Sequence, residues 1–235
     1  KHFSRSAKRL IASADQYRAN SFYLPWVGEV NFQSAIDWFT DFKGSTHIYG
    51  HRTELEELLT PRDLRKAHPI FCLNSHLHFT KLGRAFWLTG EDKYALAFSA
   101  QINDWIERNP VNMGINWLNE ELVARRTINW LFSFSYFVFS PALEEGFLLK
   151  FLKSLFLHGA FLAGQLKNSS SAPLASASAL YMLSHSFPEF TITDQWIKLA
   201  KKILQSVVTE VLDSDGVSRE GSISAHLRNL TFLLY

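Results

Sequence analysis

The sequence is poor in the residues and patterns that support a disulfide-linked or sheet-based fold. Its 235 residues include one cysteine, Cys72, so an internal disulfide is excluded. An exported protein is not excluded, because many exported bacterial enzymes lack disulfides. Alternating apolar runs typical of strands are nearly absent. The net charge of +2 is too small to indicate a nucleic-acid partner, and we expect none.

Long apolar runs of the kind that cross a membrane are also missing. The best candidate, residues 147–166, contains Lys150, Lys153 and His158, so it predicts a buried amphipathic helix. The start, Lys1-His2-Phe3, lacks the basic and apolar pattern of a signal peptide. We therefore expect neither a membrane span nor a signal peptide in this sequence.

Aromatic residues are what the sequence has in excess. They make up 14% of it, with 20 Phe and 7 Trp. Such rings either fill a core or line a groove that stacks on sugars. Most Phe lie in apolar helical runs, which favours the core. A locally basic surface could still attract an acidic polymer, despite the small net charge.

Nearly every long segment has the period of an amphipathic helix. Helices are expected over residues 4–19, 71–88, 92–107, 120–139, 141–166, 174–185, 193–212 and 222–235, with short helical pieces in 55–66. They form pairs with short links, which indicates an all-α fold, either a stacked solenoid or an α/α toroid. We find no fixed-period repeat, so the stacked solenoid is the less favoured of the two alternatives.

The first 52 residues differ from the rest. Pro25, Gly28, Gly44 and Gly50 interrupt residues 20–52, which predicts a long ordered loop with short turns. We therefore divide the chain into residues 1–52, a helix and loop packed on the toroid, and residues 53–235, the toroid itself. The final apolar run has no stop signal after it, so the toroid is expected to be incomplete at its C-terminus.

Several short motifs follow one another over residues 30–230. They are Val30-Asn31-Phe32 with Ile36-Asp37-Trp38, Leu73-Asn74-Ser75-His76, Leu88-Thr89-Gly90-Glu91-Asp92-Lys93-Tyr94-Ala95, Asn109-Pro110 with Gly114-Ile115-Asn116-Trp117, Phe187-Pro188-Glu189, and Asp215-Gly216-Val217 with Glu220 and Ser222. Each motif is weak alone, but their order and spacing are specific. Together they resemble the heparinase II/III-like polysaccharide lyase family.

The resemblance implies an α/α toroid that precedes a C-terminal β-sandwich domain, absent from this sequence. It implies cleavage of uronate-containing acidic polysaccharides by β-elimination, in the periplasm or outside the cell. Heparan-type, alginate-type and bacterial exopolysaccharide substrates all stay open. The resemblance implies no cofactor in this domain, although a metal in the C-terminal domain is compatible with it.

Elimination needs groups that stabilise an enediolate-like charge and groups that transfer protons. The resemblance places an Asn-His element at Ser171 and Ala172, and a Tyr at Ala225. None of these three residues can act as a base or neutralise a carboxylate well. The sequence therefore favours a disabled or degenerate catalytic centre. His226, beside Ala225, is a candidate for a surviving acid or base.

Polar residues within the motifs are candidates for substrate binding. Asn74 and His78 are four apart and share a face if they lie on one helix, while His76 points elsewhere. All three are predicted to line a groove, with the alternative that each is a capped or solvated polar residue. Asn116 and Trp117 either line the groove, with Trp117 as a sugar platform, or form a turn with Trp117 in the core.

Arg126 lies in an otherwise apolar helix, where a half-buried guanidinium needs a partner. That partner is either a carboxylate of the protein, from Glu120, Glu121 or Glu220, or a carboxylate of the substrate, which suits the guanidinium fork. Glu220 is predicted to orient its neighbours, and it is also a candidate for contact with the substrate.

A metal site is not expected. His47 and His51 are four apart, but Gly50 argues against a helix there and no third ligand is apparent. Three functions stay open: a lyase domain acting on an acidic polysaccharide, a non-catalytic glycan-binding or scaffold domain derived from it, and a helical interaction module with no glycan role.

Overall fold

The computed structural model describes residues 4–40, 42 and 49–234. Within these residues the helices and strands comprise a series of helices, joined by loops, and one antiparallel two-stranded hairpin. The elements are α1 (Arg5–Arg18), β1 (Ser21–Leu24), β2 (Gly28–Asn31), α2 (Arg52–Leu58), α3 (Pro61–Lys66), α4 (His68–Asn74), α5 (His78–Thr89), α6 (Lys93–Arg108), the 3-10 turn η1 (Ile115–Trp117), α7 (Glu120–Phe137), α8 (Glu145–Lys167), α9 (Pro173–Ser186), α10 (Thr193–Val211) and α11 (Ile223–Leu233).

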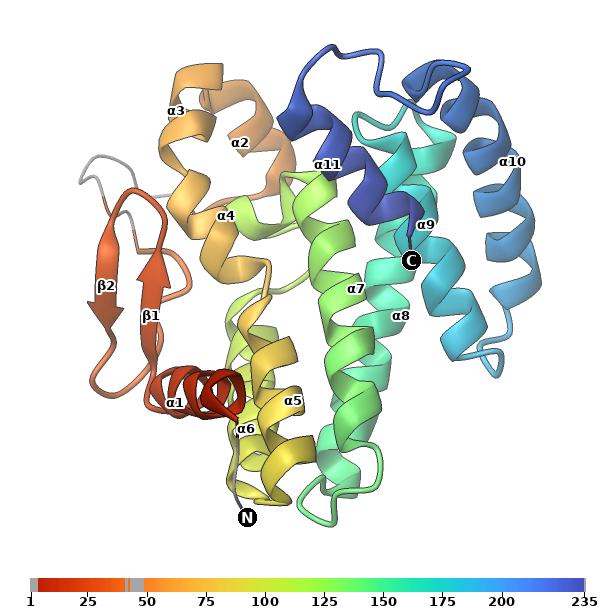
Figure 1. The fold of residues 1–235 in the computed structure, drawn as a ribbon. Coiled ribbons are helices and arrows are strands. Elements are labelled where there is room, and N and C mark those ends of the chain that lie inside the picture. Colours follow the sequence, from red (N-terminus) through yellow and green to blue (C-terminus); the bar gives the residue numbers. More distant parts are fainter. Residues whose placement is uncertain (1–3, 41, 43–48, 235) are drawn as a thin grey trace.

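The helices from α5 onward form two layers (Figure 1). In one layer α5 packs on α7, α7 on α9, and α9 on α11. In the other layer α8 contacts both α6 and α10. Because consecutive helices alternate between the layers, the fold is an open arc of an α/α toroid. The all-α toroid predicted from the sequence is confirmed.

The sequence accounts for where these helices begin and end. The Asn119 side chain accepts a hydrogen bond from the Leu122 N–H at 3.0 Å and caps α7, and Ser222 caps α11 in the same way through the Ala225 N–H at 3.0 Å. Pro173 occupies the first position of α9, where its missing N–H costs nothing. Gly90, with φ of 74°, ends α5 in a left-handed conformation.

The aromatic residues fill the space between the two layers. Four tryptophans, each at most 1% exposed, meet at its centre: Trp38, Trp105, Trp117 and Trp130. Phenylalanines from α5, α6, α7 and α8 extend this cluster. The core interpretation of the aromatic excess therefore holds for most of these rings.

Two predictions about local structure were wrong. Residues 20–52 include a regular hairpin, in which Ser21 pairs with Asn31 and Leu24 with Gly28. The strands are too short to give a clear alternating pattern. The predicted helix over 71–88 is two helices, because His76 adopts a left-handed φ of 57° between them. Asn74 and His78 therefore lie on different helices and share no helix face.

One described helix, α8, is long and apolar enough to cross a membrane by length and composition. Half of that stretch is buried inside the fold, where α8 contacts α6, α7, α9 and α10. Core helices of this kind pass the same test of length and hydropathy.

Candidate functional site

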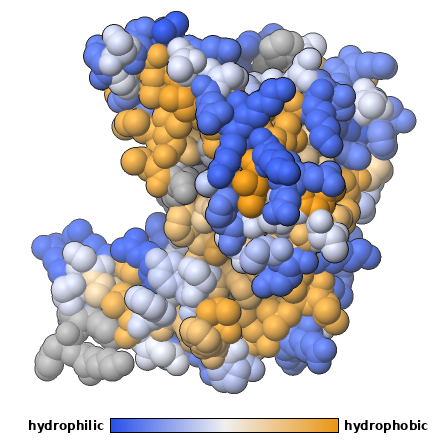
Figure 2. Space-filling model, turned by 90° about the vertical axis from the view of Figure 1, so that its right-hand side faces the viewer, coloured by the Kyte–Doolittle hydropathy of each residue, from blue (hydrophilic) through white to orange (hydrophobic). Residues whose placement is uncertain are grey.

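A surface groove lies where α4, α7 and α11 meet. It encloses about 680 Å³ and is lined by His68 and Cys72 from α4, Arg125 from α7, and Leu227 and Arg228 from α11. The molecule is hollowed on the side that carries α11 (Figure 2). The groove thus joins three elements that are far apart in the sequence.

Two arginines on the walls of the groove are partly exposed, and each is paired with a carboxylate. Arg125 donates to Oε1 of Glu121 at 2.7 and 2.9 Å and lies over the Phe232 ring at 4.8 Å. Arg228 pairs with Glu220. Both arginine side chains are more than a third exposed, so these pairs stabilise the fold by only about 0–1 kcal/mol each. A sulfate or carboxylate group can therefore compete for either guanidinium.

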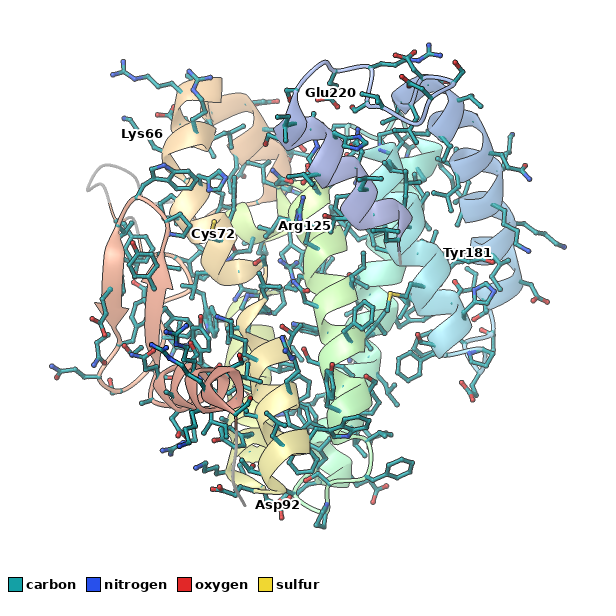
Figure 3. The ribbon with its side chains drawn as sticks, in the orientation of Figure 1. Lys66, Cys72, Asp92, Arg125, Tyr181 and Glu220 are labelled. Carbon is teal, nitrogen blue, oxygen red and sulfur yellow. The ribbon has the colours of Figure 1, made fainter. Side chains whose placement is uncertain are left out.

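Cys72 on α4 lies across the groove from Arg125 on α7 (Figure 3). His68 lines the groove from the same helix as Cys72. The Cys72 thiol is 3.3 Å from Nδ1 of His68. Burial raises the pKa of the Cys72 thiol, and the nearby Arg125 only partly opposes this effect. The thiol therefore stays protonated at neutral pH and is a poor nucleophile.

A smaller cavity of about 190 Å³ adjoins the groove and shares Glu121 and Arg228 with it. Ser171 and Ala172 line this cavity. Glu120, buried at the start of α7, holds the loop between α8 and α9 by accepting hydrogen bonds from the Ser170 hydroxyl and the Ser171 N–H. The two predicted catalytic positions therefore lie beside the groove, and neither side chain there can transfer a proton at neutral pH.

The third predicted catalytic position, Ala225, is in the first turn of α11 and is 5% exposed. His226 does not line the groove; its Nδ1 accepts a hydrogen bond from the Ser218 N–H at 3.3 Å. It thus supports the turn that precedes α11. Glu220 pairs with Arg228, which lines the groove; its contact with a substrate stays a prediction.

The structure places Asn74, His76 and His78 in the core. Asn74 is fully buried, donates to the carbonyls of Trp38 and Ile70, and accepts from the Trp105 indole at 2.8 Å. Its hydrogen-bonding capacity is used within the fold. Asn74 therefore does not line a groove, contrary to the prediction from the sequence.

The two histidines are buried among rings. His76 Nδ1 accepts from the Trp130 indole at 2.7 Å, while its Nε2 has no hydrogen-bond partner among the residues that the structure describes. His78 donates from Nε2 to Gln101 at 3.0 Å. Burial lowers the pKa of His78 to about 3 and holds the pKa of His76 well below its usual range. Both are neutral core residues, not groove residues.

Asn116 and Trp117 also lie in the core. Asn116 is fully buried and donates to Oδ1 of Asn109 at 2.8 Å. Trp117, 1% exposed, donates to the Asn109 carbonyl at 3.1 Å. Of the two alternatives, a turn with Trp117 in the core describes their placement.

Arg126 is fully buried, and none of the expected glutamates is its partner. Its Nε donates to His158 at 3.0 Å, and its two terminal nitrogens donate to the Asn116 carbonyl. The guanidinium also lies 4.2 Å from the centre of the Trp105 ring. Burial lowers the pKa of Arg126, and the carbonyl and ring contacts offset that cost. This arginine is inaccessible to a polysaccharide.

The described residues contain no group of three histidine, cysteine or carboxylate side chains able to hold a metal ion. His51 bonds to the Thr53 hydroxyl at 2.9 Å, next to the start of α2. His47, its proposed neighbour in a metal site, lies outside the described residues.

The sequence reasoning missed Arg125, Arg228, His68 and Cys72 as groove residues. Arg125 and Arg126 are adjacent, and the apolar pattern around them does not say which one faces inward. The available signal was the spacing of four between Glu121 and Arg125, which predicts an ion pair on one exposed face.

Comparison with known proteins adds an independent line of evidence. The family model described as Heparinase II/III N-terminus matches residues 9–234. The chain is similar to the heparin-sulfate lyase of Pedobacter heparinus, with 29% identity over 168 residues, covering 67% of this chain and 25% of that protein. It is similar to the heparin-sulfate lyase of Bacteroides stercoris, with 26% identity over 175 residues, covering 66% of this chain and 26% of that protein.

Solved structures share the fold. The chain is similar to heparan sulfate lyase from Pedobacter heparinus, with a TM-score of 0.74 and 20% identity, over 100% of this chain and 34% of that one. It is similar to heparinase III, with a TM-score of 0.70 and 19% identity, over 98% of this chain and 34% of that one. The chain thus spans about a quarter of the length of the curated relatives it matches.

Proposed function

The chain belongs to the heparinase II/III family, and from this we propose that it is the helical domain of a polysaccharide lyase and binds a uronate-containing acidic polysaccharide. The observation that carries the proposal is the groove between α4, α7 and α11, with Arg125 and Arg228 partly exposed on its walls. Guanidinium groups suit the carboxylates and sulfates of such a chain. The names of the curated relatives favour a glycan of the heparan sulfate type.

We propose further that the acid–base centre of this domain is disabled. In β-elimination a base takes the proton beside the uronate carboxylate, a carbon–carbon double bond forms, and the glycosidic oxygen leaves with a proton. Ser171, Ala172 and Ala225 offer no group for either transfer. His68 lines the groove from α4 and is not among the residues that line the cavity at Ser171 and Ala172.

A second candidate function is a non-catalytic glycan-binding or scaffold domain derived from the lyase fold. The same substitutions at positions 171, 172 and 225 favour it. The two functions differ in one respect, which is whether bound polysaccharide is ever cleaved.

The binding part is tested by titrating the full-length protein with heparan sulfate oligosaccharides in a calorimeter. Arg125→Ala removes a guanidinium from the groove and should weaken the Kd about ten-fold, the loss of one charge-assisted contact. Arg108→Ala is the matched control, because Arg108 also pairs with a carboxylate four residues away, Asp104, but lies on α6. Equal affinities of the two variants would contradict a polysaccharide site in this groove.

The catalytic part is tested by the ultraviolet absorbance of unsaturated uronates after prolonged incubation. We expect no product from the unchanged protein. The triple variant Ser171→Asn, Ala172→His and Ala225→Tyr, which restores the side chains that the family resemblance implies, should form more product than the unchanged protein. Clear product from the unchanged protein would overturn the disabled centre and favour the active lyase.

A further inference from the structure

We propose that Trp26, Arg65 and His68 form a remote subsite that takes one acidic sugar unit of the same polysaccharide, beyond the groove. This inference rests on the proposed function and adds to it a binding site outside the groove between α4, α7 and α11. Three observations carry it: the display of Trp26, the unpaired charge of Arg65, and the position of His68 between two cavities.

Trp26 is exposed, and its backbone conformation is unfavourable for a tryptophan. It lies in the three-residue loop that joins β1 to β2, and its φ is 64°, a region that favours glycine or asparagine. Its side chain is 72% exposed and belongs to no buried cluster. An exposed indole in a strained backbone stabilises neither the turn nor the core, so folding alone does not explain it.

The ring of Trp26 is nevertheless held in place. It meets His68 edge to face, with ring centres 4.6 Å apart and an angle of 80°. β1 also contacts α4, the helix that begins with His68. A platform of this kind suits the apolar face of a sugar ring, because the indole is already positioned and loses little freedom on binding.

The cavity in front of Trp26 is mostly apolar and has one cationic residue, Arg65, on its wall. It encloses about 290 Å³ and is lined by Trp26, Arg65, His68 and Pro69. These lining residues include no acid, and no ion pair joins Arg65 to any acid among the described residues. The guanidinium of Arg65, which is exposed on α3, is thus free to accept a carboxylate or sulfate. An apolar ring face beside an anion site matches the chemistry of an acidic sugar.

The subsite is continuous with the groove. His68 lines both the cavity at Trp26 and the groove of 680 Å³, and the groove in turn shares Glu121 and Arg228 with the cavity at Ser171. A linear polysaccharide that follows this path would reach Trp26 only when it is long enough. The subsite should therefore act on long chains and leave short ones unaffected.

The test compares two lengths of heparan sulfate, a tetrasaccharide and a dodecasaccharide, titrated into the full-length protein. Trp26→Ala should weaken binding of the longer chain roughly ten-fold, which corresponds to one sugar contact, and leave the shorter chain unchanged. Trp87→Ala is the matched control, because Trp87 is the other exposed tryptophan, at 75%, and lies on α5 away from the groove. Arg65→Ala should weaken the longer chain in the same way, with a loss that shrinks at high salt.

The outcomes separate this inference from the function on which it rests. If the unchanged protein binds both lengths, Arg125→Ala weakens both and Trp26→Ala weakens neither, the subsite is refuted and the groove stands. If the unchanged protein binds neither length, the proposed function itself fails. An equal loss in Trp26→Ala and Trp87→Ala would also refute the subsite, because the effect would then not depend on position.

Discussion

Acid should destabilise this domain between pH 6.5 and pH 5, because three histidines are buried in the neutral form. His76, His78 and His158 are each at most 7% exposed. Burial lowers the pKa of all three below the ordinary value of 6.5, to about 3 for His78. His76 and His158 lie against the Trp130 ring, and His158 also accepts a hydrogen bond from Arg126. His78 lies among the rings of Tyr17, Phe22 and Phe79. These apolar rings and the nearby guanidinium all disfavour an added positive charge.

The direction and size follow from proton linkage. Below pH 6.5 the unfolded chain binds a proton at each histidine while the folded chain does not, so stability is complete above this pH and falls as the pH drops. For His78, whose pKa in the folded state is about 3, the loss at pH 5 is about 2 kcal/mol, because the folded state remains unprotonated there. The lowered pKa values of His76 and His158 add losses in the same direction, so acid removes a substantial part of a typical total stability of about 5–15 kcal/mol.

The measurement is the free energy of unfolding in urea at pH 7, 6 and 5. His78→Gln removes one titrating group and keeps a partner for Gln101, so its loss between pH 7 and pH 5 should be smaller by about 2 kcal/mol. The control is His185→Gln, whose parent side chain is exposed on α9. An unfolding free energy that is the same at pH 7 and pH 5 would refute the neutral burial of these histidines. Carboxylates titrate mainly below this window and contribute little to it.

Two further predictions concern the groove and the helix layers. Glu121→Gln frees Arg125 from its ion pair and should tighten binding of a heparan sulfate tetrasaccharide about three-fold, as measured by calorimetric titration. The control is Glu107→Gln, because Glu107 pairs with Lys150 on the other helix layer; this variant should not change the affinity. Gly159→Ala should destabilise the fold by about 1–3 kcal/mol, because the added Cβ would lie 2.5 Å from the Trp196 ring. Gly164→Ala should stabilise the fold by about 0.5–1 kcal/mol, because a Cβ there meets nothing within 4 Å. Urea denaturation measures both changes.

The sequence predicted the helical elements well because each carries a local signal. The 3.6-residue period, the caps at Asn119 and Ser222, and Gly90 at the end of α5 all act within a few residues. The break at His76 was missed for the opposite reason. Its left-handed backbone is held by rings from α6 and α7, which no local pattern reveals.

The candidate site was only partly predictable. Motif order located positions 171, 172 and 225, and the structure places Ser171 and Ala172 beside the groove. The same motifs were a poor guide to binding residues, since Asn74, His76 and Asn116 use their polar atoms to hold the tryptophan core together. A polar residue in a family motif is therefore as consistent with a buried hydrogen bond as with a ligand contact.

Arg125 and Arg126 show what decides between these alternatives. They are neighbours on α7, so their side chains diverge by about 100° around the helix axis. One direction leads to the groove and Glu121, the other to His158 and the tryptophan rings. Arg126 already donates hydrogen bonds to a protein carbonyl and a histidine, so its guanidinium has no free donor directed at a polysaccharide. The ion pair of Arg125 with Glu121 is partly exposed, so replacing Glu121 with an anionic ligand costs little free energy. We therefore expect the accessible member of the pair, Arg125, to carry the proposed binding role, while the buried Arg126 stabilises the fold.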